Sequence, residues 1–153
     1  MARKHDAAIA SEIIAEFGAR PEMLVQILRG FLARYSYISD DAIRQIADEL
    51  NLSRAEVHGV VSFYHDFRTE PPGKRIVKIC QAESCQAMGS RELTAHAEKQ
   101  LGVSMHGTTG DGEVTLEPVY CLGLCACSPA MMIDDDVYSR VDTARFDTLI
   151  AGG

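Results

Sequence analysis

The sequence has no apolar stretch long enough to cross a membrane. Its longest uncharged run, from Pro118 to Ile133, contains Pro, Gly and three Cys. It is also shorter than the roughly 20 apolar residues that a spanning helix needs. The first residues do not resemble a signal peptide either, because charged side chains between Arg3 and Glu12 interrupt any apolar segment. We therefore expect a cytoplasmic protein without membrane insertion.

Basic residues are few and scattered. The chain of 153 residues has 15 Lys and Arg against 22 Asp and Glu, which gives a formal net charge of -7. A surface that follows nucleic-acid phosphates needs clustered positive charge, and the sequence has no such block, so we expect no nucleic-acid partner. The apolar share of 46% is that of an ordinary globular protein.

Cysteine is absent from the first half of the chain. All five cysteines lie between positions 80 and 127. An odd number of cysteines in a chain expected to stay inside the cell argues against a disulfide framework. The sequence also has no C-x-x-C motif, which disfavours a thioredoxin-type dithiol catalyst. Clustered thiols of this kind are typical of metal binding or redox chemistry.

The first half of the chain predicts helices. Apolar residues recur at helical spacing in four segments. Pro21 opens the second segment, and Ser39 and Ser53 precede the third and the fourth. Ser53 and Glu56 form the S-x-x-E pattern of a capping box. We therefore expect four amphipathic helices over residues 6–65, packed on each other or on a partner.

The pattern changes after Pro71-Pro72-Gly73. The expected elements are a strand at 75–79, a helix at 90–101, strands at 114–117, 130–133 and 137–141, and a final helix that Asp142 caps. This β-α-β-β-β-α order predicts a small α/β layer with a mixed sheet. We therefore expect a helical domain over residues 1–72 and an α/β domain over residues 73–153.

The cysteines form two pairs, and each pair follows an expected strand. Cys80-x4-Cys85 comes at the end of the first strand, and Cys121-x3-Cys125 follows the second. Loops that leave neighbouring strands at one sheet edge can bring four thiolates together. Four thiolates ligate a 2Fe-2S cluster or a zinc ion, although structural zinc usually takes tighter spacing. The spacing favours the cluster. A zinc-stapled interaction module, a free-standing thiol redox enzyme and buried free thiols remain the alternatives.

Two stretches resemble a known family. The sequences C-Q-A-E-S-C, from Cys80 to Cys85, and C-L-G-L-C-A-C-S-P, from Cys121 to Pro129, are similar to the cluster motifs of the thioredoxin-like 2Fe-2S ferredoxins. Residues 57–67 with residues 71–74 are similar to the segment that joins the helical part of that family to its ferredoxin part. The family includes the 24 kDa subunit of respiratory complex I and the matching subunits of soluble NAD-reducing hydrogenases and formate dehydrogenases.

The resemblance implies a fold and a set of ligands. The fold would be α/β, with an N-terminal helical bundle followed by a thioredoxin-like α/β ferredoxin domain. The ligands of the 2Fe-2S cluster would be Cys80, Cys85, Cys121 and Cys125. Cys127 occupies a position that is commonly not Cys in the family, so it is expected to be a non-ligand.

The resemblance also implies electron transfer rather than catalysis within this chain. The stretch from Cys80 to Gly89 is most similar to the gamma subunit of molybdenum-dependent, NAD-linked formate dehydrogenases. The chain would then exchange single electrons with FMN in a flavin- and NAD-binding partner subunit and, through it, with a molybdenum formate dehydrogenase subunit. FMN, NAD and the molybdenum cofactor would belong to partner subunits only. The alternative is the equivalent subunit of complex I (NADH:quinone oxidoreductase) or of NAD-reducing hydrogenase.

The remaining polar features predict structure rather than chemistry. His58 and His65 flank an apolar stretch and are expected to be hydrogen-bonded structural residues. His96 and His106 have no partner at ligand spacing. The Asp134-Asp135-Asp136 run predicts a solvated hairpin turn. Residues 107–112 match no nucleotide-binding pattern and predict a flexible loop.

Overall fold

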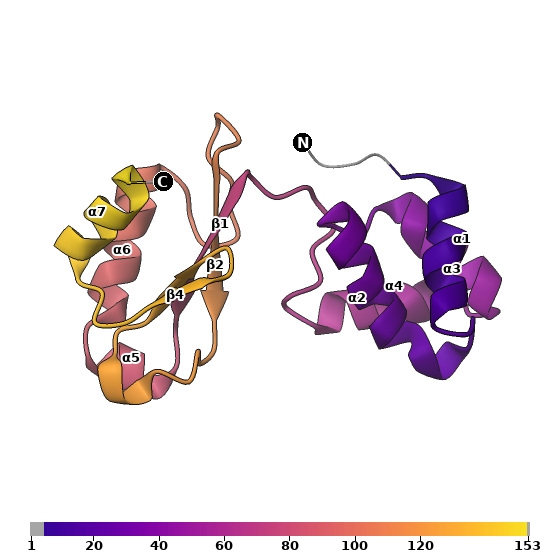
Figure 1. Ribbon diagram of the computed structural model, residues 1–153, viewed down its shortest axis with the longest axis horizontal. Helices are drawn as coiled ribbons and strands as arrows, with labels where there is room; N and C mark the ends of the chain where they lie inside the picture. The colour runs from indigo at the N-terminus through magenta and orange to yellow at the C-terminus, as the bar shows by residue number, and fades with distance from the viewer. Residues whose placement is uncertain (1–4, 153) are drawn as a thin grey trace. The chain divides into compact units, whose positions relative to one another are not determined.

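The computed structural model describes residues 5–152. Residues 1–4 and residue 153 lie outside the described residues. They include the outer ends of the two expected domains and part of the segment that was compared with a signal peptide. The chain forms two compact units that divide between Pro71 and Pro72 (Figure 1). Within residues 5–152, no helix has both the length and the apolar character needed to cross a membrane.

The first unit contains the four expected helices. They are α1 (Ala7–Glu16), α2 (Leu24–Tyr35), α3 (Asp40–Leu50) and α4 (Arg54–Phe63). Pro21 does not open α2 itself. It begins a short 3-10 turn, η1 (Pro21–Met23), and α2 follows at Leu24. A proline fits this place because the first turn of a helix does not use its missing N–H.

Side-chain caps fix where three of these helices begin. The carboxylate of Asp6 accepts a hydrogen bond from the N–H of Ala8 at the start of α1. The hydroxyl of Ser39 accepts one from the N–H of Ala42, the third residue of α3. The predicted capping box is confirmed at α4, where Ser53 and Glu56 each accept from the other's backbone N–H. The hydrogen bonds from the backbone and hydroxyl of Ser53 lower the pKa of Glu56.

The core of the first unit comes from the apolar stripes of all four helices. Ile14, Ile27, Phe31 and Ile46 are fully buried there. The ring of Tyr35 stacks on Phe31 with a centroid distance of 5.8 Å. The helices therefore pack on one another, which is one of the two arrangements expected from the sequence, the other being packing on a partner.

Two glycines inside these helices give opposite predictions. A Cβ atom at Gly30 would lie 2.8 Å from Cγ2 of Ile13 and 3.0 Å from the ring of Phe17, whereas one at Gly59 would meet nothing within 4 Å. Overpacking costs about 1–3 kcal/mol, and replacing a helical glycine by alanine gains about 1 kcal/mol. We therefore expect Gly30→Ala to lower the free energy of unfolding and Gly59→Ala to raise it. Urea unfolding followed by circular dichroism checks both, and a Gly30→Ala variant more stable than wild type would contradict the close packing.

The second unit is built on a four-stranded sheet. Its strands are β1 (Arg75–Cys80), β2 (Val114–Val119), β3 (Met131–Ile133) and β4 (Asp136–Tyr138), in the order β2-β1-β3-β4. The central strand β1 pairs in parallel with β2 and antiparallel with β3. The mixed sheet expected from the sequence is therefore confirmed.

Two helices pack against one face of this sheet. They are α6 (Ser90–Leu101) and α7 (Thr143–Ala151), and Figure 1 shows them side by side. Leu93 from α6 and Phe146 from α7 bury their side chains against Val77, Ile79 and Leu116 of the strands. Asp142 caps α7, as expected, by accepting from the N–H of Arg145. This core holds β1 and β2 in a fixed register, which positions the ends of both strands.

The second unit differs from the expected elements in three places. A short helix, α5 (Glu83–Ala87), lies inside the first cysteine loop. The last strand, expected at 137–141, runs instead from Asp136 to Tyr138, so the hairpin turn is only Asp134 and Asp135. The segment expected as a flexible loop is hydrogen-bonded back onto β2, for example from the N–H of Thr109 to the carbonyl of Val114 at 2.8 Å.

Candidate metal centre

The ends of β1 and β2 bring the two cysteine loops together. In the parallel register, Cys80 at the end of β1 lies opposite Val119 at the end of β2. Cys85 follows in α5, and Cys121 comes two residues after Val119. Cys125 begins a 3-10 turn, η2 (Cys125–Cys127), which lies beside α5 (Figure 1). Cysteines 35 or more residues apart in sequence therefore share one sheet edge because the two strands are parallel neighbours.

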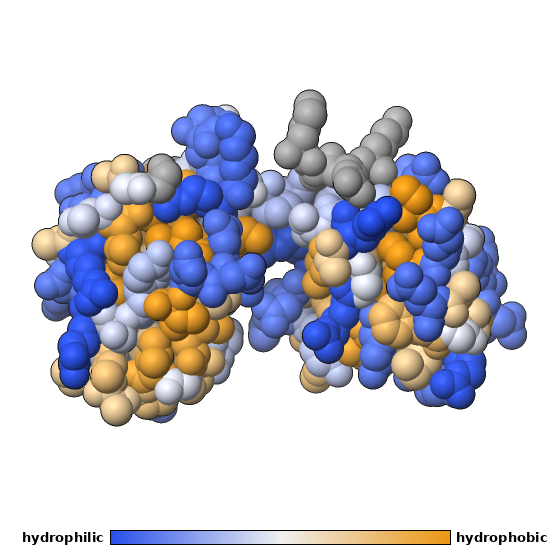
Figure 2. All heavy atoms as spheres, in the orientation of Figure 1, coloured by the Kyte–Doolittle hydropathy of each residue, from blue (hydrophilic) through white to orange (hydrophobic). Residues whose placement is uncertain are grey.

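The site is buried on one side and open on the other. Cys80 and Cys85 are 1% and 2% exposed, whereas Cys121 and Cys125 are exposed. An apolar shell around the buried pair is formed by Ala82, Val119, Leu122, Leu124 and Ala130. In the view of Figure 2, pale-orange atoms predominate at the lower end of this unit, where α5 and η2 lie, and blue atoms at its upper end. The buried pair therefore lies in a small apolar core, and the exposed pair is open to solvent.

The thiols are close enough to influence one another. The sulfur atoms of Cys121 and Cys125 lie 3.5 Å apart. Burial raises the pKa of the Cys85 thiol, and the neighbouring Cys80 and Cys125 thiols raise it further. The four thiols thus form two pairs, 80 with 85 and 121 with 125, which interact through Cys125.

The backbone favours a thiolate at Cys121. The N–H of Gly123 donates to Sγ of Cys121 at 3.3 Å and lowers the pKa of that thiol, and the Cys125 thiol lowers it further. The same thiol–thiol contact raises the pKa of Cys125. The contact therefore favours ionisation of Cys121 over Cys125, and a metal that takes both sulfurs binds them as thiolates.

The backbone of Cys121 is in an uncommon conformation. Its φ angle is +88°, and that of Gly123 is +75°. Glycine adopts such angles without cost, but a residue with a Cβ pays for them. Backbone strain of this kind clusters at ligand-binding and catalytic sites. The tight turn aims the Gly123 N–H at the sulfur of Cys121.

The donor set fits a 2Fe-2S cluster, because each iron takes two cysteine thiolates and the site offers two pairs. Within residues 5–152, no three His, Cys, Asp or Glu side chains converge closely enough to hold one metal ion. The acidic run at 134–136 forms no cation site in this part of the chain, and its Asp134 carboxylate instead accepts from the N–H of Ile76.

Cys127 differs from the other four cysteines in its surroundings. It lies at the end of η2, half-buried, and both of its backbone groups are engaged. Its N–H donates to the carbonyl of Leu124, and its carbonyl accepts from the N–H of Arg140, each at 2.8 Å. Its backbone therefore ties the cysteine loop to the segment before α7.

Three serines that were not singled out in the sequence touch the backbone of this site. The hydroxyl of Ser90, which is fully buried, donates to the carbonyl of Cys80 at 2.5 Å. Ser84 and Ser128 surround the carbonyl of Cys125. The one sequence signal for them is that Ser84 immediately precedes Cys85 and Ser128 follows Cys125 closely.

His96 and His106 make side-chain contacts with carboxylates within the second unit. His96 Nε2 lies 2.7 Å from a carboxylate oxygen of Asp147, and this contact joins α6 to α7. His106 Nδ1 lies 2.7 Å from a carboxylate oxygen of Glu117 on β2. His58 and His65, in the first unit, are both exposed. His96 and His106 fall between the two cysteine pairs in sequence, and their side chains pair with carboxylates of the second unit.

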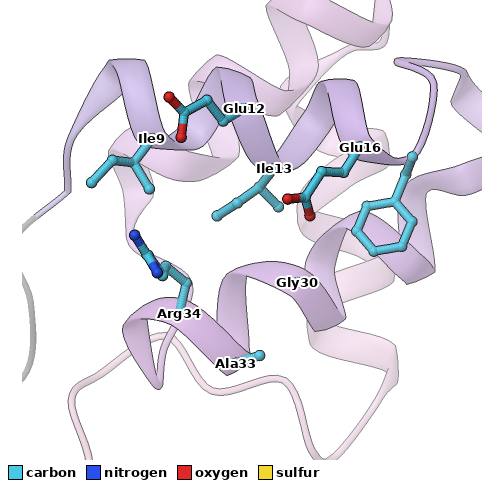
Figure 3. A pocket seen from close by; sticks show the side chains of 8 residues that line it. Ile9, Glu12, Ile13, Glu16, Gly30, Ala33 and Arg34 are labelled. Atoms are coloured by element: carbon cyan, nitrogen blue, oxygen red, sulfur yellow. The ribbon is translucent and has the colours of Figure 1, made fainter.

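The first unit has a hollow of about 470 Å³ between α1 and α2 (Figure 3). Ile9 and Ile13 lie along the α1 side with Glu12 and Glu16 at the rim, and Arg34 reaches toward them from α2. Its lining contains no thiol and no imidazole. This hollow therefore offers no soft ligands, and the cysteine edge of the second unit is the candidate centre.

Comparisons with known proteins find relatives of this chain. The thioredoxin-like 2Fe-2S ferredoxin family matches residues 10–152. The chain is 34% identical over 129 residues to a subunit of NADH-quinone oxidoreductase from Buchnera aphidicola, covering 84% of this chain and 75% of that protein. It is 35% identical over 117 residues to the subunit of the same name from Pseudomonas aeruginosa, covering 76% and 70%.

A solved structure extends the likeness. The chain is similar to a chain of an NAD+-reducing NiFe-hydrogenase in its air-oxidized state, with a TM-score of 0.70 and 26% identity. The match covers 84% of this chain and 22% of the hydrogenase chain. The similarity therefore concerns one part of a much larger polypeptide.

Proposed function

This chain belongs to the thioredoxin-like 2Fe-2S ferredoxin family, and from that premise we propose that it is the electron-transfer subunit of a multisubunit NAD-linked oxidoreductase of the NADH-quinone oxidoreductase or NAD-reducing hydrogenase type. Its cofactor is a 2Fe-2S cluster. The single observation that carries the proposal is the meeting of two cysteine pairs at one edge of the sheet.

Cys80, Cys85, Cys121 and Cys125 would hold the cluster. When bound, it supplies one-electron chemistry at thiolate-ligated iron. The chain itself contributes position and surroundings. The buried pair is covered by apolar side chains, and the exposed pair lies on the turn that directs the Gly123 N–H at sulfur. Hydrogen bonds to ligand sulfur and limited solvent access are the means by which proteins adjust the potential of such a centre.

The partner would be a subunit that binds a flavin and NAD. A flavin can divide a hydride into single electrons, which a one-electron carrier can accept. The exposed pair, Cys121 and Cys125, is the side on which electrons would pass. Two large apolar residues near the cysteines in sequence are exposed: Met88, three residues after Cys85, is 62% exposed, and Tyr120, next to Cys121, is 61% exposed. Exposed apolar surface beside a functional site is typical of a protein interface.

Formate dehydrogenase is the narrower version of this proposal. It rests on the wording of the sequence from Cys80 to Gly89. The named relatives are subunits of NADH-quinone oxidoreductase and of a hydrogenase, and they therefore favour the alternative. Co-purification with a molybdenum subunit would favour formate dehydrogenase, and a membrane arm or a nickel subunit would favour the other two.

The test is a metal and sulfide count on protein purified without air. We expect two irons and two acid-labile sulfides per chain, a reddish-brown colour, and a rhombic S = 1/2 EPR signal after reduction with dithionite. A colourless protein with one zinc would instead establish the zinc-stapled module. Reversible disulfide formation without bound metal would establish the thiol redox enzyme. Either result would overturn the proposal.

A further inference from the structure

The carbonyl of Cys125 is held by two serine hydroxyls from different parts of the chain. Oγ of Ser84 lies 2.9 Å from this oxygen, and Oγ of Ser128 lies 2.7 Å from it. The two hydroxyl oxygens lie 2.8 Å from each other. Ser84 is in α5, immediately before Cys85, whereas Ser128 follows η2. Three oxygens therefore form a closed group between the two cysteine segments.

The two hydroxyl hydrogens of this group are enough to link Ser84 to the second cysteine segment. Each hydroxyl has one hydrogen to donate and can accept as well. Two hydrogens serve three short contacts, so at least one hydroxyl donates to the Cys125 carbonyl, and the other donates to that carbonyl or to its neighbour. Ser128 is buried, whereas the contact between Ser84 and the Cys125 carbonyl lies at the surface. Every arrangement of the two hydrogens leaves Ser84 joined to the second segment.

The hydrogen bond of Ser128 is local, whereas that of Ser84 joins the two cysteine segments. Ser128 is three residues from Cys125, so its hydrogen bond is local to the second segment. The contact of Ser84 with Cys125 joins residues 41 apart in sequence. Other links between the segments run through the backbone, for example from the N–H of Cys80 to the carbonyl of Ala130. Ser84 thus adds a side-chain attachment to a connection that the backbone otherwise makes.

We propose that Ser84 is a positioning residue that holds the Cys125 turn against the helix of Cys85 and so sets the separation of the two cysteine pairs. This inference rests on the proposed function, because it assumes that both pairs ligate one cluster. Without the hydroxyl, the pairs remain attached through the backbone links and sample a wider range of separations. The cluster would then be released faster, and its EPR signal would be broader.

The expected effects separate the two serines. The net worth of one hydrogen bond corresponds to about a fivefold change in an equilibrium. We therefore expect Ser84→Ala to release iron to a chelator about fivefold faster than wild type. Ser128→Ala keeps the contact between Ser84 and Cys125 and should change the rate less. Thr148→Ala is the matched control, since it removes a hydroxyl that donates to a backbone carbonyl in the same unit, far along the chain from the cysteines.

The experiment uses the full chain, purified without air. Iron release to a chelator, EPR line width after dithionite and the urea midpoint are measured for each variant. Ser84→Thr and Ser84→Val have the same shape and differ only in the hydroxyl, so this pair keeps the test valid if Ser84→Ala does not fold. We expect Ser84→Thr to match wild type, and Ser84→Val to release iron faster with a broader signal.

Three results would overturn the inference. Equal release rates for Ser84→Ala, Thr148→Ala and wild type would show that the hydroxyl does not matter. A lower urea midpoint with an unchanged EPR signal would show a general structural role instead of positioning. A wild-type chain without a 2Fe-2S signal would be a failure of the proposed function itself, and it is visible before any variant is made.

Discussion

Replacing Cys125 by serine is expected to remove or alter the cluster, whereas replacing Cys127 by serine is expected to leave it intact. The two residues are only two positions apart and both lie in η2. The sulfur of Cys125 lies 3.5 Å from that of Cys121, and the Cys125 thiol raises the pKa of Cys85. Serine oxygen is a harder donor than thiolate and suits iron–sulfur chemistry poorly. Outer-shell partners alone are worth about 10- to 100-fold in metal affinity, so loss of a ligand should weaken retention by more than about 100-fold.

The measurement is iron and acid-labile sulfide per chain in the two variants, prepared side by side without air. Cys127→Ser serves as the matched control, because it removes a thiol from the same turn while leaving the proposed ligands in place. Circular dichroism checks that both variants keep their helices. Equal loss of iron from both variants would refute the ligand assignment. Loss from Cys127→Ser alone would exchange the roles of the two cysteines.

The sequence predicted the elements well because their local signals are strong. The capping box at Ser53 and Glu56 and the cap at Asp142 lie where the helices begin. The paired strands follow from β-branched and apolar runs. The short helix α5 was missed, because five residues are too few for a hydrophobic period to be visible. Pro21 was placed in α2 for a related reason, since a 3-10 turn and the first turn of an α-helix share the same signal.

The site was predictable in its residue types but not in its contacts. The spacing of Cys80, Cys85, Cys121 and Cys125 is local information, and the parallel pairing of β1 with β2 turns it into proximity. The serine group depends on Ser84 meeting a carbonyl 41 residues away. The contact of His96 with Asp147 spans 51 residues. No sequence pattern pairs Ser84 with Cys125 or His96 with Asp147, so such contacts become visible only once the elements are packed.

Replacing Phe146 by alanine is expected to release the cluster at a lower urea concentration, whereas Phe31→Ala is expected to spare it. Both rings are fully buried, Phe31 in the first unit and Phe146 between α7 and the sheet. Truncating a buried phenylalanine costs about 3–5 kcal/mol. Phe146 supports the strands whose ends carry the cysteines, and its core is separate from that of Phe31. If residues 1–72 and 73–153 are independent domains, each substitution should act only on its own unit.

The independence of the two units is tested by recording two signals in the same urea titration. Tryptophan fluorescence cannot serve, because the sequence has no tryptophan. Visible absorption follows the cluster, and circular dichroism at the helix band follows both units. Phe31→Ala should add an early loss of helix signal while the cluster absorption keeps its wild-type midpoint. Phe63→Ala is the control, since that ring is 75% exposed and exposed substitutions change stability by about 0.5 kcal/mol or less. A cluster midpoint lowered equally by Phe31→Ala and Phe146→Ala would mean that the helical unit and the cluster unit unfold as one, because a cavity confined to one core cannot otherwise weaken the other.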